Sequence, residues 1–204
     1  GGHTHLYRRE PDGSCALLGC TRDDAAGEAF DKGAQMLGLE FPGGPAIDRL
    51  ARQGNREAIR FPRFHRRKSS LEFSFSRLKT SLLYKLRDMD TGERVRQTAD
   101  LAAGYQEAIV QVLASKALAA LAQENLSALA VVGGVSANSR LRGLLHEWAE
   151  RNGFRLAVPP MAYCTDNAAM IASAGRHVLM SDPGSIREFD IQPSLQVEPL
   201  SRPA

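Results

Sequence analysis

The chain has 204 residues, of which 43% are hydrophobic and 24% are charged. This balance is ordinary for a globular protein and argues against a disordered, a collagen-like or a membrane-embedded chain, and no apolar run approaches the roughly 18 residues that span a bilayer. Residues 49–96 carry 14 Lys and Arg against 5 Asp and Glu, so this stretch has a charge of +9 while the rest has −6. A basic insert on a mildly acidic body indicates a local anionic partner such as nucleic acid, or else a solvated loop with its charges spread in every direction.

Three cysteines, Cys15, Cys20 and Cys164, make no disulfide framework. A sparse and odd cysteine count is typical of a reducing compartment, and the chain starts without a secretory leader. We therefore expect a cytoplasmic protein with no membrane partner.

The N-terminal half is predicted to hold two short strands around a Pro–Gly turn, then two helices, then a basic stretch. Their ranges are 3–9, 14–21, 25–37, 47–52 and 54–96. Gly38 is the expected C-cap of the first helix, and FPGGP at 41–45 reads as a rigid loop before the second.

The C-terminal half is predicted to alternate helices and strands. A helix capped by Thr98 runs to about residue 122, and the further elements are a strand at 128–132, a helix at 139–152, a strand at 154–158, a helix from Thr165 to about 180, and a tail at 183–204. This alternation favours an α/β fold, in which ligands bind where loops follow the strands at one edge of a sheet.

The strongest local motif is GGVSAN at 133–138, directly after a predicted strand. Two glycines let the backbone approach a ligand, and the helix that follows offers N–H groups to an anion. The spacing fits neither a Walker loop nor a dinucleotide fingerprint. A tight turn with Asn138 as helix N-cap explains the same residues equally well.

Three carboxylates are candidate site residues. Asp31 and Asp48 are either solvated helix charges or acceptors for ribose hydroxyls. Asp166 is either a first-turn acid or a metal ligand. His3 and His5 point the same way from a strand, but two ligands do not make a metal site.

Six segments together resemble one family, the tRNA N6-adenosine threonylcarbamoyltransferases, called TsaD in bacteria. They are GGHT at 1–4, DDAAGEAFDK at 23–32, LGLEFPGGP at 37–45, FSFSRLKT at 73–80, GGVSAN at 133–138 and CTDNAAMIA at 164–172. They occur in the family's order and at near-family spacing over most of the chain.

The resemblance implies an α/β lobe of the actin-like, Hsp70-like and sugar-kinase-like (ASKHA) architecture. The whole chain, 1–204, would be the C-terminal part of such an enzyme, incomplete, with a mostly helical basic insert at 49–96 and the N-terminal lobe absent. Family enzymes transfer a threonylcarbamoyl group from threonylcarbamoyl-AMP to N6 of the adenosine next to the anticodon, position 37 of tRNA.

Site residues are carried over by position. Gly1, Gly2, Asp31, Gly44, Asp48 and Asn138 match substrate-contacting positions, and Asp166 matches the carboxylate ligand of one divalent metal ion, iron or zinc. Its histidine partners are expected outside this chain. The resemblance also implies tRNA, the adenylate donor and accessory protein subunits as partners.

Two alternatives stay open at this point: a non-catalytic nucleotide-binding partner lobe, and another ATPase or kinase of the same fold. Fold alone does not separate these from the transferase. The joint presence of the DDAAGEAFDK, PGGP and TDN segments favours the transferase over a kinase.

Overall fold

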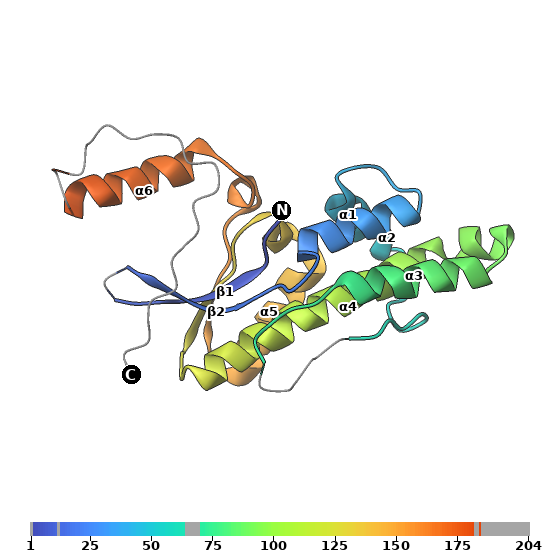
Figure 1. Ribbon diagram of the computed structural model, residues 1–204, viewed down its shortest axis with the longest axis horizontal. Coiled ribbons are helices and arrows are strands. Elements are labelled where there is room, and N and C mark those ends of the chain that lie inside the picture. The colour runs from blue at the N-terminus through green and yellow to red at the C-terminus, as the bar shows by residue number, and fades with distance from the viewer. Residues whose placement is uncertain (1, 12, 64–69, 182–183, 185–204) are drawn as a thin grey trace.

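The computed structural model describes residues 2–11, 13–63, 70–181 and 184 (Figure 1). These ranges form a mixed α/β structure that is mostly helical, with two small sheets. The elements are, in chain order, β1 (His5–Arg9), β2 (Cys15–Cys20), α1 (Ala26–Met36), α2 (Gly43–Ala51), α3 (Ser76–Asp88), α4 (Thr91–Gln123), β3 (Ala128–Ala130), η1 (Gly134–Ala137), α5 (Ser139–Asn152), β4 (Arg155–Ala157), η2 (Met161–Tyr163) and α6 (Ala168–Ser181). Gly1, residues 64–69 of the basic stretch and all of the 183–204 tail except Gly184 lie outside the described residues.

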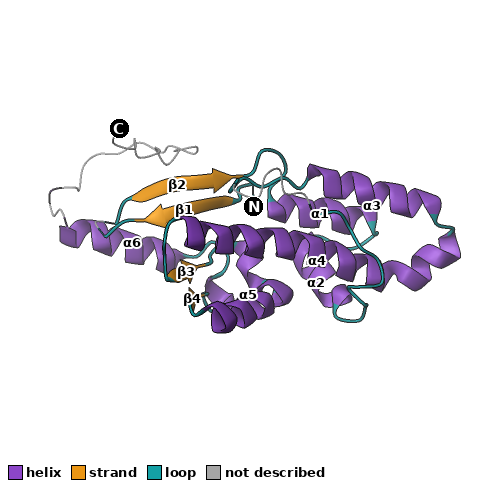
Figure 2. Cartoon of the chain, turned by 90° about the horizontal axis from the view of Figure 1, so that it is seen from below, coloured by secondary structure: helices purple, strands orange, loops and turns teal. Residues whose placement is uncertain are grey.

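The predicted hairpin is confirmed, since β1 pairs with β2 antiparallel. The second sheet pairs β3 with β4 in parallel, with α5 as the crossover between them. Figure 2 shows the two sheets on opposite sides of α4. The α/β alternation read from the C-terminal half is therefore present, although each of its strands is only three residues long.

The long helix α4 forms the centre of the core. Leu101, Tyr105, Ile109 and Val112 are fully buried along it, as their spacing of three to four residues predicts for one helical face. The prediction that Thr98 caps this helix is wrong. The helix begins at Thr91, because the side chain of Asp90 accepts a hydrogen bond from the backbone N–H of Glu93 at 2.8 Å.

The basic stretch 49–96 is less helical than expected. Between α2 and α3, the described residues 52–63 and 70–75 form no helix. Phe61, Phe73 and Phe75 from this stretch are buried in the core. Their rings therefore serve packing, while Arg63, the described arginine between Phe61 and Phe73, is exposed.

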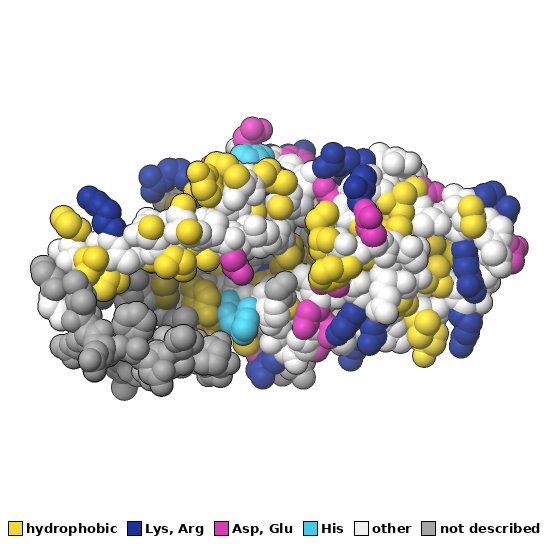
Figure 3. Space-filling model, turned by 90° about the horizontal axis from the view of Figure 1, so that it is seen from above, with side chains coloured by type: hydrophobic (Ala, Val, Ile, Leu, Met, Phe, Trp, Pro, Cys, Tyr) yellow, Lys and Arg dark blue, Asp and Glu magenta, His cyan; other side chains and the backbone are white. Residues whose placement is uncertain are grey.

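The last helix, α6, has no buried residue. Its cap is Asn167, whose side chain accepts from the N–H of Met170 at 3.0 Å, and the prediction of Thr165 as cap is wrong. Figure 3 shows hydrophobic side chains gathered over this helix. None of the helices in the described ranges combines the length and the hydrophobicity that a membrane crossing needs.

Candidate functional site

The start of α2 is held in place by Asp31 of α1. Its Oδ1 accepts a hydrogen bond from the backbone N–H of Gly43 at 2.8 Å. A Cβ on Gly43 would lie 2.6 Å from the Cα of Asp31, so the approach requires glycine. The prediction of a loop over 41–45 is wrong in its second half, because Gly43–Pro45 form the first turn of α2.

Gly44 is the neighbouring first-turn residue, and nothing lies within 4 Å of the place where its Cβ would be. N–H groups in the first turn of a helix have no intrahelical acceptor, and the helix dipole adds partial positive charge there. The open space beside Gly44 is thus suited to an anionic group.

Asp48 lies one turn further along α2 and is buried. Its Oδ1 accepts from the hydroxyl of Ser139 at 2.7 Å, and its Oδ2 accepts from Arg52 at 2.9 Å. Ser139 is the first residue of α5. Asp48 therefore ties α2 to the start of α5.

Asn138 is the N-cap of α5, as the structural reading of GGVSAN proposes. Its Oδ1 accepts from the N–H of Leu141 at 2.9 Å, and its Nδ2 donates to Oε1 of Gln106 at 2.7 Å. Both Asn138 and Gln106 are buried. The amide thus fixes the end of the glycine turn against the central helix.

These contacts bring four predicted residues to one place, which we call the junction: Asp31, Gly44, Asp48 and Asn138. Helix α1, which carries Asp31, also contacts α2 and η1. The junction combines two carboxylates, a glycine-bordered helix start and an amide. Such a set can hold the hydroxyls and the phosphate of a nucleotide.

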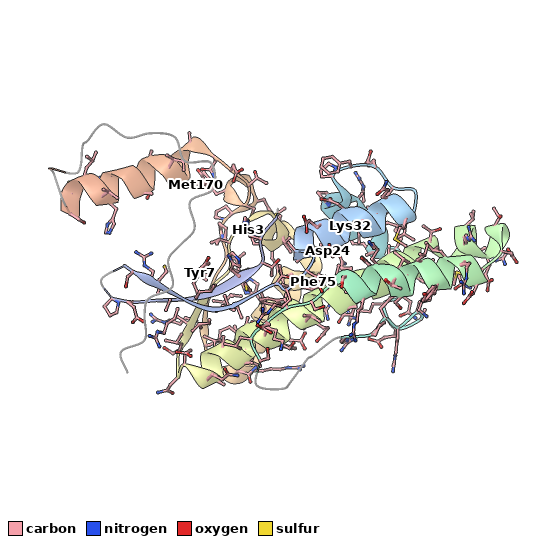
Figure 4. The ribbon with its side chains drawn as sticks, viewed as in Figure 1. His3, Tyr7, Asp24, Lys32, Phe75 and Met170 are labelled. Atoms are coloured by element: carbon pink, nitrogen blue, oxygen red, sulfur yellow. The ribbon has the colours of Figure 1, made fainter. Side chains whose placement is uncertain are left out.

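The segment that precedes β1 lies beside α1. Thr4 accepts a hydrogen bond from the N–H of Ala26 at 2.9 Å, so GGHT adjoins the start of α1. Gly2 is exposed, and nothing lies within 4 Å of the place where its Cβ would be. The rings of His3 and His5 lie 5.1 Å apart, and Figure 4 labels His3, which precedes β1, and Tyr7 of β1. Burial, and then the charge of His3, lower the pKa of His5.

Asp166 lies in an exposed loop before α6. Within the described residues no three His, Cys, Asp or Glu side chains gather to hold a metal ion. One exposed carboxylate is too few, because metal sites in proteins use three or more protein ligands. The described residues therefore do not fit a metal centre by themselves.

Asp23 joins two of the six segments, a role that the sequence did not reveal. Its carboxylate accepts hydrogen bonds from the hydroxyls of Ser74 and Ser76 at 2.6 and 2.9 Å and from the N–H of Phe75 at 2.8 Å. Burial raises the pKa of Asp23, but these hydrogen bonds outweigh it and leave the pKa below its usual value. Asp23 thus anchors the start of α3. Its neighbour Asp24 pairs with Lys32, and both are labelled in Figure 4.

Arg142 of α5 joins two further segments. Its guanidinium donates to the carbonyls of Ser136 and Pro159 at 2.7 and 2.6 Å and lies 3.1 Å from Sγ of Cys164. GGVSAN and CTDN are therefore held together by one side chain. The hydroxyl of Ser136 is buried and has no hydrogen-bond partner in the described part of the chain.

A buried ion pair lies next to the junction. Glu107 of α4 accepts from Arg140 at 2.6 and 2.9 Å and from Gln111 at 2.8 Å. Burial raises the pKa of Glu107, but the bonds from Arg140 and Gln111 outweigh that effect and lower it below its usual value. The carboxylate is therefore held in its charged form.

We expect the ion pair of Glu107 and Arg140 to make the free energy of unfolding depend on pH. The pKa of Glu107 is lower in the folded state than in the unfolded state, so its contribution is complete above the unfolded-state pKa and is lost as the pH falls through the folded-state pKa. Measured by urea denaturation between pH 7 and pH 3, the free energy of unfolding should fall less steeply with decreasing pH for Glu107→Gln than for the parent. Glu150→Gln, at an exposed position of α5, is the control. Equal slopes for all three proteins would contradict the assignment.

Comparisons with known proteins identify the family of the chain. A sequence profile of the family "TsaD: tRNA N6-adenosine threonylcarbamoyltransferase" matches residues 1–173. A protein of that name from Anaeromyxobacter dehalogenans (strain 2CP-1) is 52% identical over 181 residues, which cover 88% of this chain and 54% of the relative. The one from Clostridioides difficile (strain 630) is 43% identical over 201 residues, which cover 97% and 58%.

The chain thus spans little more than half the length of these relatives. Among solved structures, HypF of T. kodakarensis has the same fold at a TM-score of 0.60 and 16% identity, over 83% of this chain and 21% of HypF. Because the family profile covers most of the sequence and the relatives share about half of the aligned residues, the chain belongs to the tRNA N6-adenosine threonylcarbamoyltransferase (TsaD) family.

Proposed function

We propose that this chain is part of an enzyme that transfers the threonylcarbamoyl group from threonylcarbamoyl-AMP to N6 of adenosine 37 in tRNA. The family membership supports this function. The observation that carries it is the junction, where hydrogen bonds join Asp31 to the start of α2 and Asp48 to the start of α5. Side chains more than ninety residues apart in the sequence meet there.

The junction offers the groups that an adenylate donor needs. Oδ2 of Asp31 accepts no hydrogen bond from the described residues, and each carboxylate oxygen has room for two, so Asp31 and Asp48 can accept from ribose hydroxyls. The N–H of Gly44 can donate to the phosphate. With the donor fixed, the adenosine amine attacks the carbamoyl carbon and gives up one proton to water, while the bond from that carbon to the phosphate oxygen breaks and AMP leaves. Fixing the donor in this orientation lowers the barrier.

We further propose that the fold is one lobe of an actin-like, Hsp70-like architecture, which the likeness to HypF supports at the level of fold. In this proposal the protein works in the cytoplasm with tRNA, the adenylate donor and accessory subunits. Gly1, Gly2 and Asp166 keep their predicted roles as substrate contacts and metal ligand. Members of this family bind a metal ion, and in this proposal Asp166 would supply one ligand to it, with the other ligands outside the described residues.

Transfer should be measured with a protein that spans the full length of the relatives, as threonylcarbamoyladenosine formed on tRNA. Asp31→Asn keeps an oxygen for the N–H of Gly43 but removes the charged acceptor. We expect the KM for the donor to rise about tenfold or more, since a hydrogen bond to a charged group contributes roughly 1.5–3 kcal/mol. Asp88→Asn, on the exposed end of α3, should leave the KM unchanged. No transfer by the parent protein would overturn the proposed function and favour a partner lobe.

A further inference from the structure

A cavity of about 700 Å³ lies between residues 54–63, α4 and α5, on the other side of Glu107 from the core. Its volume is within the range of about 300–1,000 Å³ that ligand sites in proteins occupy. Five arginines line it: Arg56, Arg60, Arg63, Arg140 and Arg151. We call it the arginine cavity.

Three of these arginines are neutralised by carboxylates that line the same cavity. Glu57 pairs with Arg60 at 3.3 Å, Glu107 with Arg140 at 2.6 Å, and Glu147 with Arg151 at 2.8 Å. Arg56 and Arg63 are exposed, and neither has an ion pair in the described ranges. The five arginines and three glutamates give the cavity a net charge of +2, with Arg56 near enough to Glu107 to help lower the pKa of that carboxyl. Guanidinium binds phosphate through two parallel hydrogen bonds.

An aromatic ring shares the cavity with these charges. Trp148, the single tryptophan of the chain, lines it and packs partly against the core. A half-buried ring beside arginines is the arrangement on which an unpaired RNA base stacks. An inorganic anion or a carboxylate could bind to the arginines but would make no stacking contact with the ring of Trp148.

The cavity continues toward the junction. A second cavity of about 560 Å³ shares Arg56, Glu57, Glu107 and Arg140 with it and reaches Ser139, which donates to Asp48. Along α5, Ser139 and Arg151 are separated by about 18 Å at a rise of 1.5 Å per residue. The two cavities are thus neighbours, and the second reaches the residue that is hydrogen-bonded to Asp48.

We propose that the arginine cavity is an RNA-binding site, in which Arg56 and Arg63 bind backbone phosphates and Trp148 stacks on an unpaired base. The inference rests on the proposed function, in which tRNA is the acceptor, and adds where the RNA is held. An RNA strand bound there would extend through the second cavity toward Asp48.

The test uses tRNA binding by the chain, followed through the fluorescence of Trp148. The double variant Arg56→Glu/Arg63→Glu should weaken tRNA binding at least tenfold and reduce the slope of log K against log salt by about 1.5–2, because two phosphate contacts are lost. Both side chains are exposed, so the fold should survive. Arg96→Glu is the matched control, an exposed arginine of the same basic stretch that does not line the cavity. It should leave the quenching of Trp148 by tRNA unchanged.

The outcomes separate this proposal from the proposed function. Tight tRNA binding by the parent, with equal affinity and salt slope in the double variant, would overturn the cavity proposal alone. Quenching of Trp148 by AMP or inorganic phosphate as strong as that by tRNA would also overturn it, in favour of a mononucleotide site. Parent protein that binds no tRNA at all would overturn the cavity proposal and remove tRNA from the proposed function.

Discussion

In the full-length protein, Gly44→Val is expected to weaken binding of the adenylate donor at least about a hundredfold while the melting temperature stays within a few degrees of the parent. No atom lies within 4 Å of the place where a Cβ on Gly44 would be, so the fold has room for a side chain. The same space is where the proposed phosphate meets the first-turn N–H groups of α2. Loss of a charge-assisted hydrogen bond together with a steric block accounts for the size of the effect. Calorimetric titration with AMP, the leaving group of the donor, measures it.

Gly43→Ala is the matched comparison, one residue away. Its Cβ would lie 2.6 Å from the Cα of Asp31 and 2.7 Å from the Cβ of Ala34, so α1 and α2 must move apart. Overpacking of this kind costs about 1–3 kcal/mol of stability. If Gly44→Val destabilised the protein as much as Gly43→Ala, or bound AMP as well as the parent, Gly44 would be a structural residue only.

Most elements of the fold were predictable because their signals are local. The helix of α5 was readable from its apolar stripe and from its end at Gly153, which has a φ of +72° in the structure. The hairpin was readable from the Pro–Gly turn between two short predicted strands. In each case the residues that decide the structure lie within a few positions of one another.

The start of α2 was misplaced because its hydrogen-bond partner lies on another helix, whereas the start of α4 was misplaced although its cap is local. The run FPGGP resembles a loop, yet Gly43 begins a helix because Asp31, twelve residues earlier, accepts its N–H. Thr98 resembles a cap, but Asp90 starts α4 a full two turns earlier. For α2, helix propensity is a weak guide, because a side chain from another helix accepts the hydrogen bond at its start.

The candidate site stays a prediction as to its role, and the sequence named its residues without giving their geometry. The six segments of the resemblance pointed to Asp31, Gly44, Asp48 and Asn138, and the structure joins them through contacts that no spacing encodes. Ser139 and Gln106 carry those contacts without belonging to any motif that drew attention. Ser139 lies 91 residues from Asp48 and Gln106 lies 32 residues from Asn138, so the sequence alone does not reveal either pairing.

Asn138→Ala is expected to produce the largest loss of stability among the junction residues, about 2–4 kcal/mol. The N–H of Leu141 loses its cap acceptor, which costs about 1 kcal/mol. The buried Oε1 of Gln106 loses its donor, and an unsatisfied buried polar group costs roughly 1–3 kcal/mol more. Urea denaturation measures the change, and Asn152→Ala at the exposed end of α5 should stay within about 0.5 kcal/mol of the parent.

A double-mutant cycle separates the two contributions. If the Asn138–Gln106 hydrogen bond is real, adding Gln106→Ala to Asn138→Ala should cost less than Gln106→Ala costs alone, because the unsatisfied oxygen is then gone. Strict additivity would show that Asn138 stabilises α5 only as its cap. Asn138→Asp sharpens the distinction, since a carboxylate still caps Leu141 but offers no hydrogen to Gln106. The Gln106 amide can turn so that its Nε2 donates to this carboxylate, so Asn138→Asp should cost less stability than Asn138→Ala.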